Sequence, residues 1–337
     1  MISYKIKTCN TASKAATQTA TDILHDVFPF VRVYKNGTII RYLPEELVPP
    51  STDPTARVRS KDVTIDHHRN ISARIFVPEN LKLRQNLPIL VYYHGGGFTT
   101  GSAFSKTYNT YLTSLVSKAK IVAVSVNYRL APEHDLPIGY DDAWYALKWV
   151  FSHSRSLGGN GSEPWLRKNV DFGKGFVGGD SAGGNIAHNV VLRAGLEKKS
   201  GIVLKGLFLN CPNFWGSTRI GEEEKKPFEV VFRNRLWLLV HPNVPATFDY
   251  PATNPSLDPN IHKLGCKNLL VYVAGEDILR DRGELYVDTL NKSAWGGSIR
   301  FFDIPGEGHV FDIANPDTDN ARKMLHEVAL FITEDNA

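Results

Sequence analysis

Residues 176–185 read FVGGDSAGGN, and the rest of the chain can be interpreted around this stretch. It contains the pattern Gly-x-Ser-x-Gly, in which Ser181 stands between Gly179 and Gly183. In a nucleophile elbow, a serine occupies a strained turn between a strand and a helix, and small neighbours let the backbone fold tightly. Apolar residues recur at helical spacing over residues 185–193, so the N–H groups of a helix N-terminus would point toward the serine. The stretch therefore favours a nucleophilic serine, although such short patterns also occur in ordinary glycine-rich turns.

A base and an acid are expected after Ser181, because a serine hydroxyl becomes a good nucleophile only when a positioned base removes its proton. In doubly wound hydrolases, the acid and then the histidine follow the serine on loops after later strands. His309 meets this requirement, since it comes directly after a strand predicted over residues 299–304. His241 and His262 have no such strand before them and are interpreted as structural. His309 is the predicted base, and a loop histidine that caps the next turn is the alternative.

Asp277 is the predicted acid, because it stands just beyond a strand predicted over residues 269–274. Its neighbour Glu276 is the residue most easily confused with it. Asp281 is interpreted as the N-cap of a following helix. A role for Asp277 that only ties its loop together remains open.

Residues 94–97 read HGGG and follow another predicted strand, over residues 87–93. A tetrahedral intermediate needs N–H donors where its oxygen will lie, and glycines let backbone amides approach that position. We predict that the N–H groups of Gly95, Gly96 and Ala182 form this oxyanion hole. A nucleotide-binding loop is the rival interpretation, but the stretch lacks Gly-x-Gly-x-x-Gly and a lysine-serine ending.

Apolar strands alternate with helical patterns through most of the chain, which predicts an α/β fold with a parallel sheet. A hairpin is predicted over residues 34–41, because Asn36-Gly37 accepts the positive φ of a tight turn. A second strand pair is predicted at 63–66 and 72–77. The predicted strands are 87–93, 121–126, 175–178, 204–210, 269–274 and 299–304, and the predicted helices are 108–116, 140–151, 185–193, 283–292 and 321–333.

Two regions do not fit the alternation. Residues 12–26 have a loosely helical pattern, and the apolar residues over 28–33 after them favour an N-terminal arm docked on the protein. Residues 213–251 combine aromatic residues with a charged run at 222–226. The run is interpreted as a solvated helix face, and the aromatic residues as an inserted helical piece over the edge of the sheet.

The composition is that of a soluble globular protein, with 42% hydrophobic and 22% charged residues in 337. Because 39 basic and 35 acidic residues are spread along the chain, no nucleic-acid partner is expected. No apolar run suits a signal peptide or a membrane span, so we expect no membrane partner and a cytoplasmic location. Residues 1–21 carry no acid, which leaves an organellar address as the alternative. Cys9, Cys211 and Cys266 are expected to be free thiols.

Three blocks carry a family resemblance: HGGGF at 94–98, YRLAPE at 128–133 and GDSAGGN at 179–185. Together they resemble the signature blocks of the hormone-sensitive-lipase branch of the α/β hydrolases, in particular the plant carboxylesterases. The similarity runs from about residue 30 to residue 332. It implies one α/β-hydrolase domain over 1–337, with a mostly parallel eight-stranded sheet flanked by helices. It also implies a helical cap formed by about residues 1–50 and about 213–251.

The expected function is therefore that of a serine carboxylesterase that hydrolyses esters of small molecules through an acyl-enzyme, without a cofactor or a metal. Ser181, Asp277 and His309 would be catalytic. The resemblance also brings alternatives on the same scaffold, namely a lyase, dehydratase or cyclase of plant specialised metabolism. A hormone receptor of the gibberellin-receptor type is a further alternative, but such receptors lack the histidine that His309 supplies here. The oligomeric state is left open.

Overall fold

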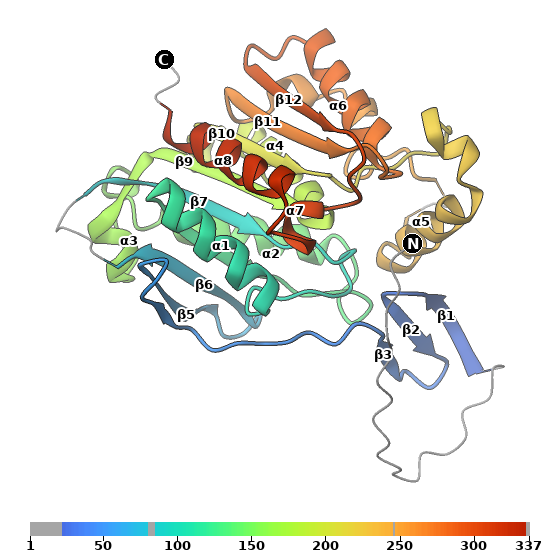
Figure 1. Cartoon of the computed structure of the whole chain (residues 1–337), viewed down its shortest axis with the longest axis horizontal. Coiled ribbons are helices and arrows are strands. Elements are labelled where there is room, and N and C mark those ends of the chain that lie inside the picture. Colours follow the sequence, from blue (N-terminus) through green and yellow to red (C-terminus); the bar gives the residue numbers. More distant parts are fainter. Residues whose placement is uncertain (1–21, 80–84, 245–246, 335–337) are drawn as a thin grey trace.

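The apolar runs of the chain form one central sheet of nine strands, covered by helices on both faces (Figure 1). The computed structural model describes residues 22–79, 85–244 and 247–334. The first six strands across the sheet are mutually parallel, and the last three alternate in direction. Across the sheet, the order is β12 (Ser298–Ile304), β11 (Asn268–Ala274), β10 (Gly206–Asn210), β9 (Val170–Asp180), β7 (Leu87–Tyr93), β8 (Val122–Asn127), β6 (Ile71–Pro78), β5 (Val58–Asp66) and β4 (Thr52–Asp53).

The α/β fold and the mostly parallel sheet are confirmed, with one strand more than the eight that the resemblance implied. The additional strand is β4, whose two residues pair antiparallel with β5 at the edge of the sheet. The predicted hairpin and the predicted strand pair are also confirmed, as β2 (Val31–Tyr34) with β3 (Ile39–Arg41) and as β5 with β6.

Two helical layers bury the sheet. The side chains of β7 alternate between them: Val91 and Tyr93 belong to one hydrophobic cluster, and Leu90 and Tyr92 belong to the other. Burial on both faces explains why β7 reads as an almost continuous apolar run. One layer contains α2 (Ile138–Phe151), α4 (Ala182–Leu196) and α6 (Arg280–Lys292), with α3 (Pro164–Asn169) at the start of β9; the other contains α1 (Lys106–Ala119), α7 (Phe311–Ala314) and α8 (Asp319–Thr333).

The N-terminal arm is a small antiparallel sheet of β1 (Ile23–Val27), β2 and β3. The helical pattern over residues 12–26 is therefore wrong for 23–26, and residues 12–21 of that prediction fall outside the described residues. The alternating valines of β2 offer β1 a half-buried pairing partner, and sheet hydrogen bonds then outweigh a weak helical pattern. The arm contributes strands, and no helix, to the part of the predicted cap that the structure describes.

The insertion after β10 contains the helix α5 (Pro227–Val240). In Figure 1, α5 lies next to the small sheet, although nearly two hundred residues separate the two in the sequence. The rings of Phe30 and Phe232 stack with their centroids 5.7 Å apart. The arm and the insertion therefore pack against each other.

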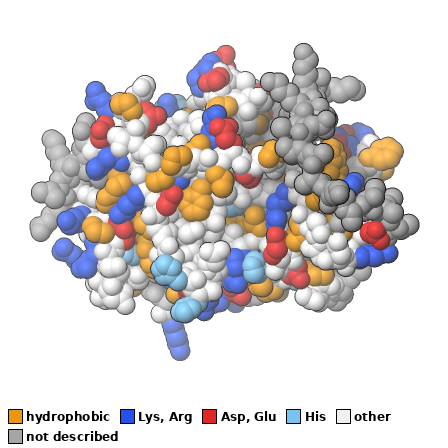
Figure 2. Space-filling view, turned by 90° about the horizontal axis from the view of Figure 1, so that it is seen from below, with side chains coloured by type: hydrophobic (Ala, Val, Ile, Leu, Met, Phe, Trp, Pro, Cys, Tyr) orange, Lys and Arg blue, Asp and Glu red, His pale blue; other side chains and the backbone are white. Residues whose placement is uncertain are grey.

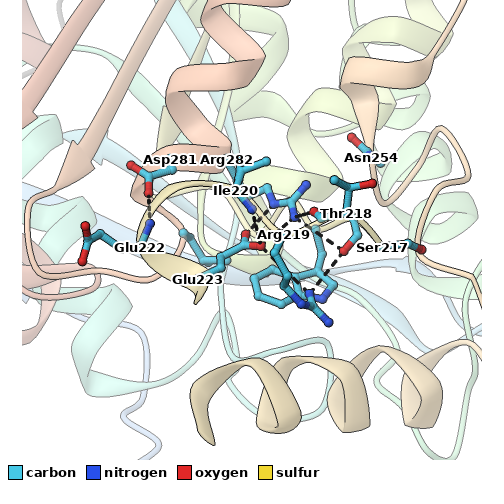
Figure 3. Close-up of polar contacts among 12 residues, drawn as sticks. Ser217, Thr218, Arg219, Ile220, Glu222, Glu223, Asn254, Asp281 and Arg282 are labelled. Carbon is cyan, nitrogen blue, oxygen red and sulfur yellow. Dashed lines mark hydrogen bonds and ion pairs between the residues drawn. The ribbon is translucent and has the colours of Figure 1, made fainter. Parts of the chain in front are cut away.

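The charged run over 222–226 is not a uniformly solvated helix face. It forms a short 3-10 turn, and Glu223 within it is only 1% exposed. Its carboxylate accepts hydrogen bonds from the guanidinium of Arg282 at 2.6 and 2.8 Å (Figure 3). The prediction failed for Glu223 because the long-range partner that makes its burial tolerable is invisible in the local sequence.

Asp281 completes this anchor, and it is not the N-cap of α6. The helix begins at Arg280, and the Asp281 carboxylate accepts the backbone N–H of Glu222 at 2.7 Å (Figure 3). Arg282 also donates to the carbonyl of Thr218 at 2.7 Å. The start of α6 therefore holds the insertion in place through one buried ion pair and three hydrogen bonds to backbone groups, the third from Arg282 to the carbonyl of Gly216.

The surface shows no block of one charge on the face in Figure 2, where basic, acidic and hydrophobic side chains are interspersed. Within the described ranges, no helix has both the length and the apolar character needed to cross a bilayer.

We predict that Glu223→Gln lowers the free energy of unfolding by about 3–5 kcal/mol, because it leaves the buried Arg282 without its charged partner. Glu222→Gln is the matched control: it removes the same charge from the next residue, whose side chain is 49% exposed, and should change stability little. Urea unfolding followed by circular dichroism measures both. Equal stabilities of the two variants would show that the ion pair does not anchor the insertion.

Candidate active site

Ser181 occupies the turn between β9 and α4 that the sequence predicted. Its φ of 51° and ψ of −119° are strained for a residue with a side chain. A Cβ at Gly179 would lie 2.4 Å from the carbonyl oxygen of Gly183, and a Cβ at Gly183 would lie 2.0 Å from that of Tyr93. Because neither contact is possible, both positions require glycine. The turn brings Ser181 to the carboxyl edge of the sheet.

Asp277 and His309 reach the same edge from the loops that follow β11 and β12. His309 Nε2 lies 2.8 Å from Ser181 Oγ, and His309 Nδ1 lies 2.6 Å from Asp277 Oδ2. An ionised carboxylate only accepts hydrogen bonds, so Nδ1 carries the proton of the neutral imidazole and Nε2 accepts from the serine hydroxyl. Ser181 and Asp277 are buried, whereas 28% of the His309 side chain is exposed. The structure thus brings together the three residues that were predicted as nucleophile, acid and base.

The surroundings of Asp277 keep it ionised. Burial raises its pKa, but His309, Arg233 and the N–H of Leu279 act in the opposite direction, and the net result lies below the usual value. Glu276, the neighbouring acid, is exposed. His241 lies at the end of α5, and His262 lies in a short 3-10 turn. Neither the second acid nor the other two histidines takes part in this hydrogen-bonded chain.

The glycine-rich loop after β7 offers N–H groups beside the serine. Gly96 has a φ of 104°, and a Cβ there would lie 2.2 Å from the carbonyl oxygen of Thr100, so only glycine fits. Among the described residues, the N–H groups of Gly96, Gly97 and Ala182 have no acceptor in the protein. They are available to bind a negatively charged oxygen.

Gly95 has another role. Its N–H donates to Asp180 Oδ1 at 3.0 Å and to the Tyr108 hydroxyl at 2.8 Å, so it is not free to bind an oxyanion. The prediction for Gly95 is corrected for this reason, and Gly97 takes its place among the candidate donors. Gly97 belongs to the same glycine run, so the sequence could have indicated it as a candidate donor. The sequence could not show in which direction each backbone N–H points.

Asp180 connects this loop to the elbow. Besides the Gly95 N–H, its carboxylate accepts hydrogen bonds from the hydroxyls of Tyr92 at 2.7 Å and Tyr108 at 3.0 Å. Complete burial raises the pKa of Asp180 to about 6, although the two tyrosines partly oppose that shift. The residue next to the nucleophile therefore holds the start of the glycine loop, a role that sequence reasoning missed.

The block at residues 128–133 supports the same loop from the other side. The Tyr128 hydroxyl donates to the carbonyl of His94 at 2.7 Å, and the Ala131 N–H donates to the carbonyl of Phe98 at 2.9 Å. Both ends of the HGGGF stretch are thus fixed. This contact gives a structural reason for the YRLAPE block, which carried no predicted role.

The arm and α5 also contact the glycine loop. A Cβ at Gly97 would lie 3.1 Å from Leu236 and 3.3 Å from Phe30. The rings of Phe98 and Trp237 have centroids 5.3 Å apart. The loop with the free N–H groups is therefore in contact with both regions that interrupt the strand–helix alternation.

Within the described residues, one group of side chains has the spacing of metal ligands, and it overlaps the same site. The candidate ligand atoms of Cys211, Asp277 and His309 lie within 4.8 Å of one another. Burial raises the pKa of the Cys211 thiol well above its usual value, which leaves it a poor ligand. Both ring nitrogens of His309 already have partners. The hydrogen bonds of Asp277 and His309 therefore suit acyl transfer better than metal binding.

Comparisons with known proteins agree with this fold. The family described as alpha/beta hydrolase fold matches residues 90–313. The chain is 42% identical to a 2-hydroxyisoflavanone dehydratase of Glycyrrhiza echinata, over 95% of this chain and 99% of the relative. It is 43% identical to probable carboxylesterase 7 of Arabidopsis thaliana, over 93% and 99%. An esterase structure from Pyrobaculum calidifontis superposes with a TM-score of 0.66 at 32% identity, over 82% of this chain and 84% of that one.

We predict that Asp180→Asn changes how stability depends on pH. The native pKa of Asp180 is about 6, above its ordinary 3.8, so the native state binds more protons than the unfolded state between these values. The free energy of unfolding of the wild type should therefore fall, relative to the variant, as the pH rises from about 4 to about 6, and the difference should then level off. Denaturant unfolding of both proteins over this range checks it, and parallel pH profiles would contradict it.

Proposed function

Because the chain belongs to the α/β-hydrolase family, we propose that it is a serine carboxylesterase that hydrolyses esters of small molecules through an acyl-enzyme. The observation that carries the proposal is the hydrogen-bonded chain from Ser181 Oγ through His309 to Asp277. Acyl transfer needs a nucleophile, a base and an orienting acid in this order.

In acylation, Ser181 Oγ attacks the ester carbonyl carbon while His309 Nε2 takes the hydroxyl proton. The carbon–oxygen bond to the alcohol then breaks, and His309 returns the proton to the departing alcohol. Asp277 keeps the imidazole in the tautomer with a proton on Nδ1 and stabilises the imidazolium that forms. In deacylation, His309 removes a proton from water as the water oxygen attacks the acyl carbon. The bond from that carbon to Ser181 Oγ then breaks, and His309 returns the proton to Oγ, which releases the acid and restores the serine hydroxyl.

The oxyanion is stabilised by the N–H groups of Gly96, Gly97 and Ala182, which have no acceptor among the described residues. In comparable enzymes, the loss of one such donor costs about 2.7–4 kcal/mol of transition-state stabilisation. Asp180 acts as a positioning residue, because it binds Gly95 and thereby fixes the start of this loop.

The described parts of about residues 1–50 and about 213–251 form the cap in this proposal. Phe30 and Leu236 reach the glycine loop, and Phe232 joins the arm to α5. A cover of this kind excludes bulk water from the charged intermediate and strengthens its electrostatic stabilisation. It also encloses the substrate in apolar side chains, which suits a small organic ester.

Dehydration is the second candidate, favoured by the similarity to a 2-hydroxyisoflavanone dehydratase at 42% identity. In that reaction a base removes a proton from carbon, the carbon–oxygen bond of a neighbouring hydroxyl breaks, and the base passes the proton to the departing hydroxyl, which leaves as water. His309 could serve as this base and the free N–H groups could stabilise an enolate oxygen, but Ser181 would not be acylated. Hydrolysis uses all three members of the hydrogen-bonded chain and is the preferred proposal.

We predict that Ser181→Ala and His309→Ala each lower kcat for p-nitrophenyl butyrate nearly as far as the double variant does, because the two residues act as a unit. Ser298→Ala, which changes an exposed serine of β12, should retain wild-type activity. Steady-state kinetics at neutral pH, with circular dichroism to confirm folding, measures this. If the fold-decreases in kcat of the two single variants multiplied in the double variant, or if Ser181→Ala kept most of its activity, the assignment of Ser181 and His309 as nucleophile and base would be contradicted.

A further inference from the structure

Arg233 is a buried cation with no carboxylate partner in the described part of the chain. The residue is 8% exposed, and among the described residues no carboxylate oxygen lies within 4.0 Å of its guanidinium. Its one hydrogen bond there is a long one, from Nη1 to Asn213 Oδ1 at 3.4 Å, and its Nε has no acceptor. Two other buried arginines differ, because Arg74 and Arg282 are each paired with a carboxylate at 2.7 and 2.6 Å.

The position of Arg233 on α5 directs it toward the active site. It shares the buried face of the helix with Leu236 and Trp237, three and four residues later, which contact the glycine loop. Its partner Asn213 donates a backbone hydrogen bond to the carbonyl of Ser181 at 2.8 Å. The positive charge of Arg233 also lowers the pKa of Asp277. Through Asn213 and α5, Arg233 is thus linked to the backbone of Ser181 and to the glycine loop.

A buried guanidinium without a counter-ion is costly, because desolvation of an ion costs several kcal/mol unless a partner of opposite charge compensates for it. Burial lowers the pKa of Arg233, with Asp277 and Glu229 partly opposing that change, yet an arginine stays protonated at any working pH. The Nδ2 of Asn213 beside it also lacks an acceptor. Two neighbouring donors, Arg233 Nε and Asn213 Nδ2, are thus buried without an acceptor among the described residues.

We propose that Arg233 binds a carboxylate of the substrate, so that the preferred esters carry a free carboxylate in their acyl or their alcohol part. This inference rests on the proposed esterase function. A guanidinium forms charge-assisted hydrogen bonds with a planar carboxylate, and Arg233 Nη2 has no hydrogen-bond partner among the described residues. One arginine and one neutral amide match a single negative charge, which favours a carboxylate over a phosphate.

The test compares charged and neutral esters of nearly equal shape. One pair carries the charge in the acyl part: the mono-p-nitrophenyl ester of adipic acid and its terminal amide. The other pair carries it in the alcohol part: 4-acetoxybenzoate and 4-acetoxybenzamide. We expect the wild type to hydrolyse the acid of at least one pair with a kcat/KM at least about tenfold higher than that of its amide, which corresponds to about 1.4 kcal/mol. The pair that shows the preference identifies the part of the substrate that Arg233 contacts.

Arg233→Met should reduce that preference to about one, mainly through KM, while the amides remain substrates. Methionine preserves apolar packing, and replacing a buried charge in this way is often neutral or stabilising, so folding should survive; thermal unfolding checks this. Arg235→Met is the matched control, because it removes the same charge from an exposed position of α5 and should keep the preference. Arg233→Lys should retain part of the preference for the acid over the amide, because lysine keeps the positive charge.

Two results would overturn the inference. The first is equal kcat/KM for acid and amide in both pairs in the wild type. The second is an Arg233→Met enzyme whose kcat falls equally for all four esters, since Arg233 would then act only through Asp277. Both results leave the esterase proposal intact as long as turnover still requires Ser181, so the two failures are distinguishable.

Discussion

The positive φ of Ser181 is possible only because Gly179 and Gly183 allow the backbone to approach itself and the end of β7. This close contact has consequences beyond the serine. It places the start of α4 next to Tyr93, so the glycine loop that follows β7 lies beside the nucleophile. The hydroxyl of Ser181 and the free N–H groups of Gly96, Gly97 and Ala182 therefore lie at the same edge of the sheet. The parallel order of β9, β10, β11 and β12 brings the acid and the base to that edge as well.

In the proposed mechanism, Asp180 has a positioning role that needs no contact with the substrate. The elbow fixes its backbone, and its carboxylate holds Gly95 and two tyrosine hydroxyls in a buried network. Ionisation of Asp180 costs stability, as its raised pKa of about 6 indicates. The hydrogen bond to Asp180 fixes the direction of the Gly95 N–H, and the N–H groups of Gly96 and Gly97 remain free among the described residues. Pre-organised donors of this kind need no rearrangement as charge develops in the transition state.

The sequence was sufficient for the features that depend on chain order and on local pattern. The apolar runs predicted the parallel strands, and the position of Asp277 and His309 directly after two of them predicted their meeting with Ser181. It was insufficient where a distant partner decides the outcome. Glu223 is buried because Arg282 pairs with it, and Gly95 is unavailable because Asp180 accepts its N–H. Residues 23–26 form a strand because β2 lies beside them, which no helical periodicity reveals.

Acylation of Ser181 during turnover would distinguish ester hydrolysis from dehydration, and mass spectrometry can detect it. Wild-type enzyme is quenched with acid during hydrolysis of p-nitrophenyl butyrate in isotopically labelled water, and its intact mass and peptide masses are recorded. We expect a protein heavier by one butyryl group located on Ser181, no such group on the Ser181→Ala variant, and butyrate that contains one oxygen from the labelled water. Continued turnover with no acyl group on Ser181 would contradict this expectation.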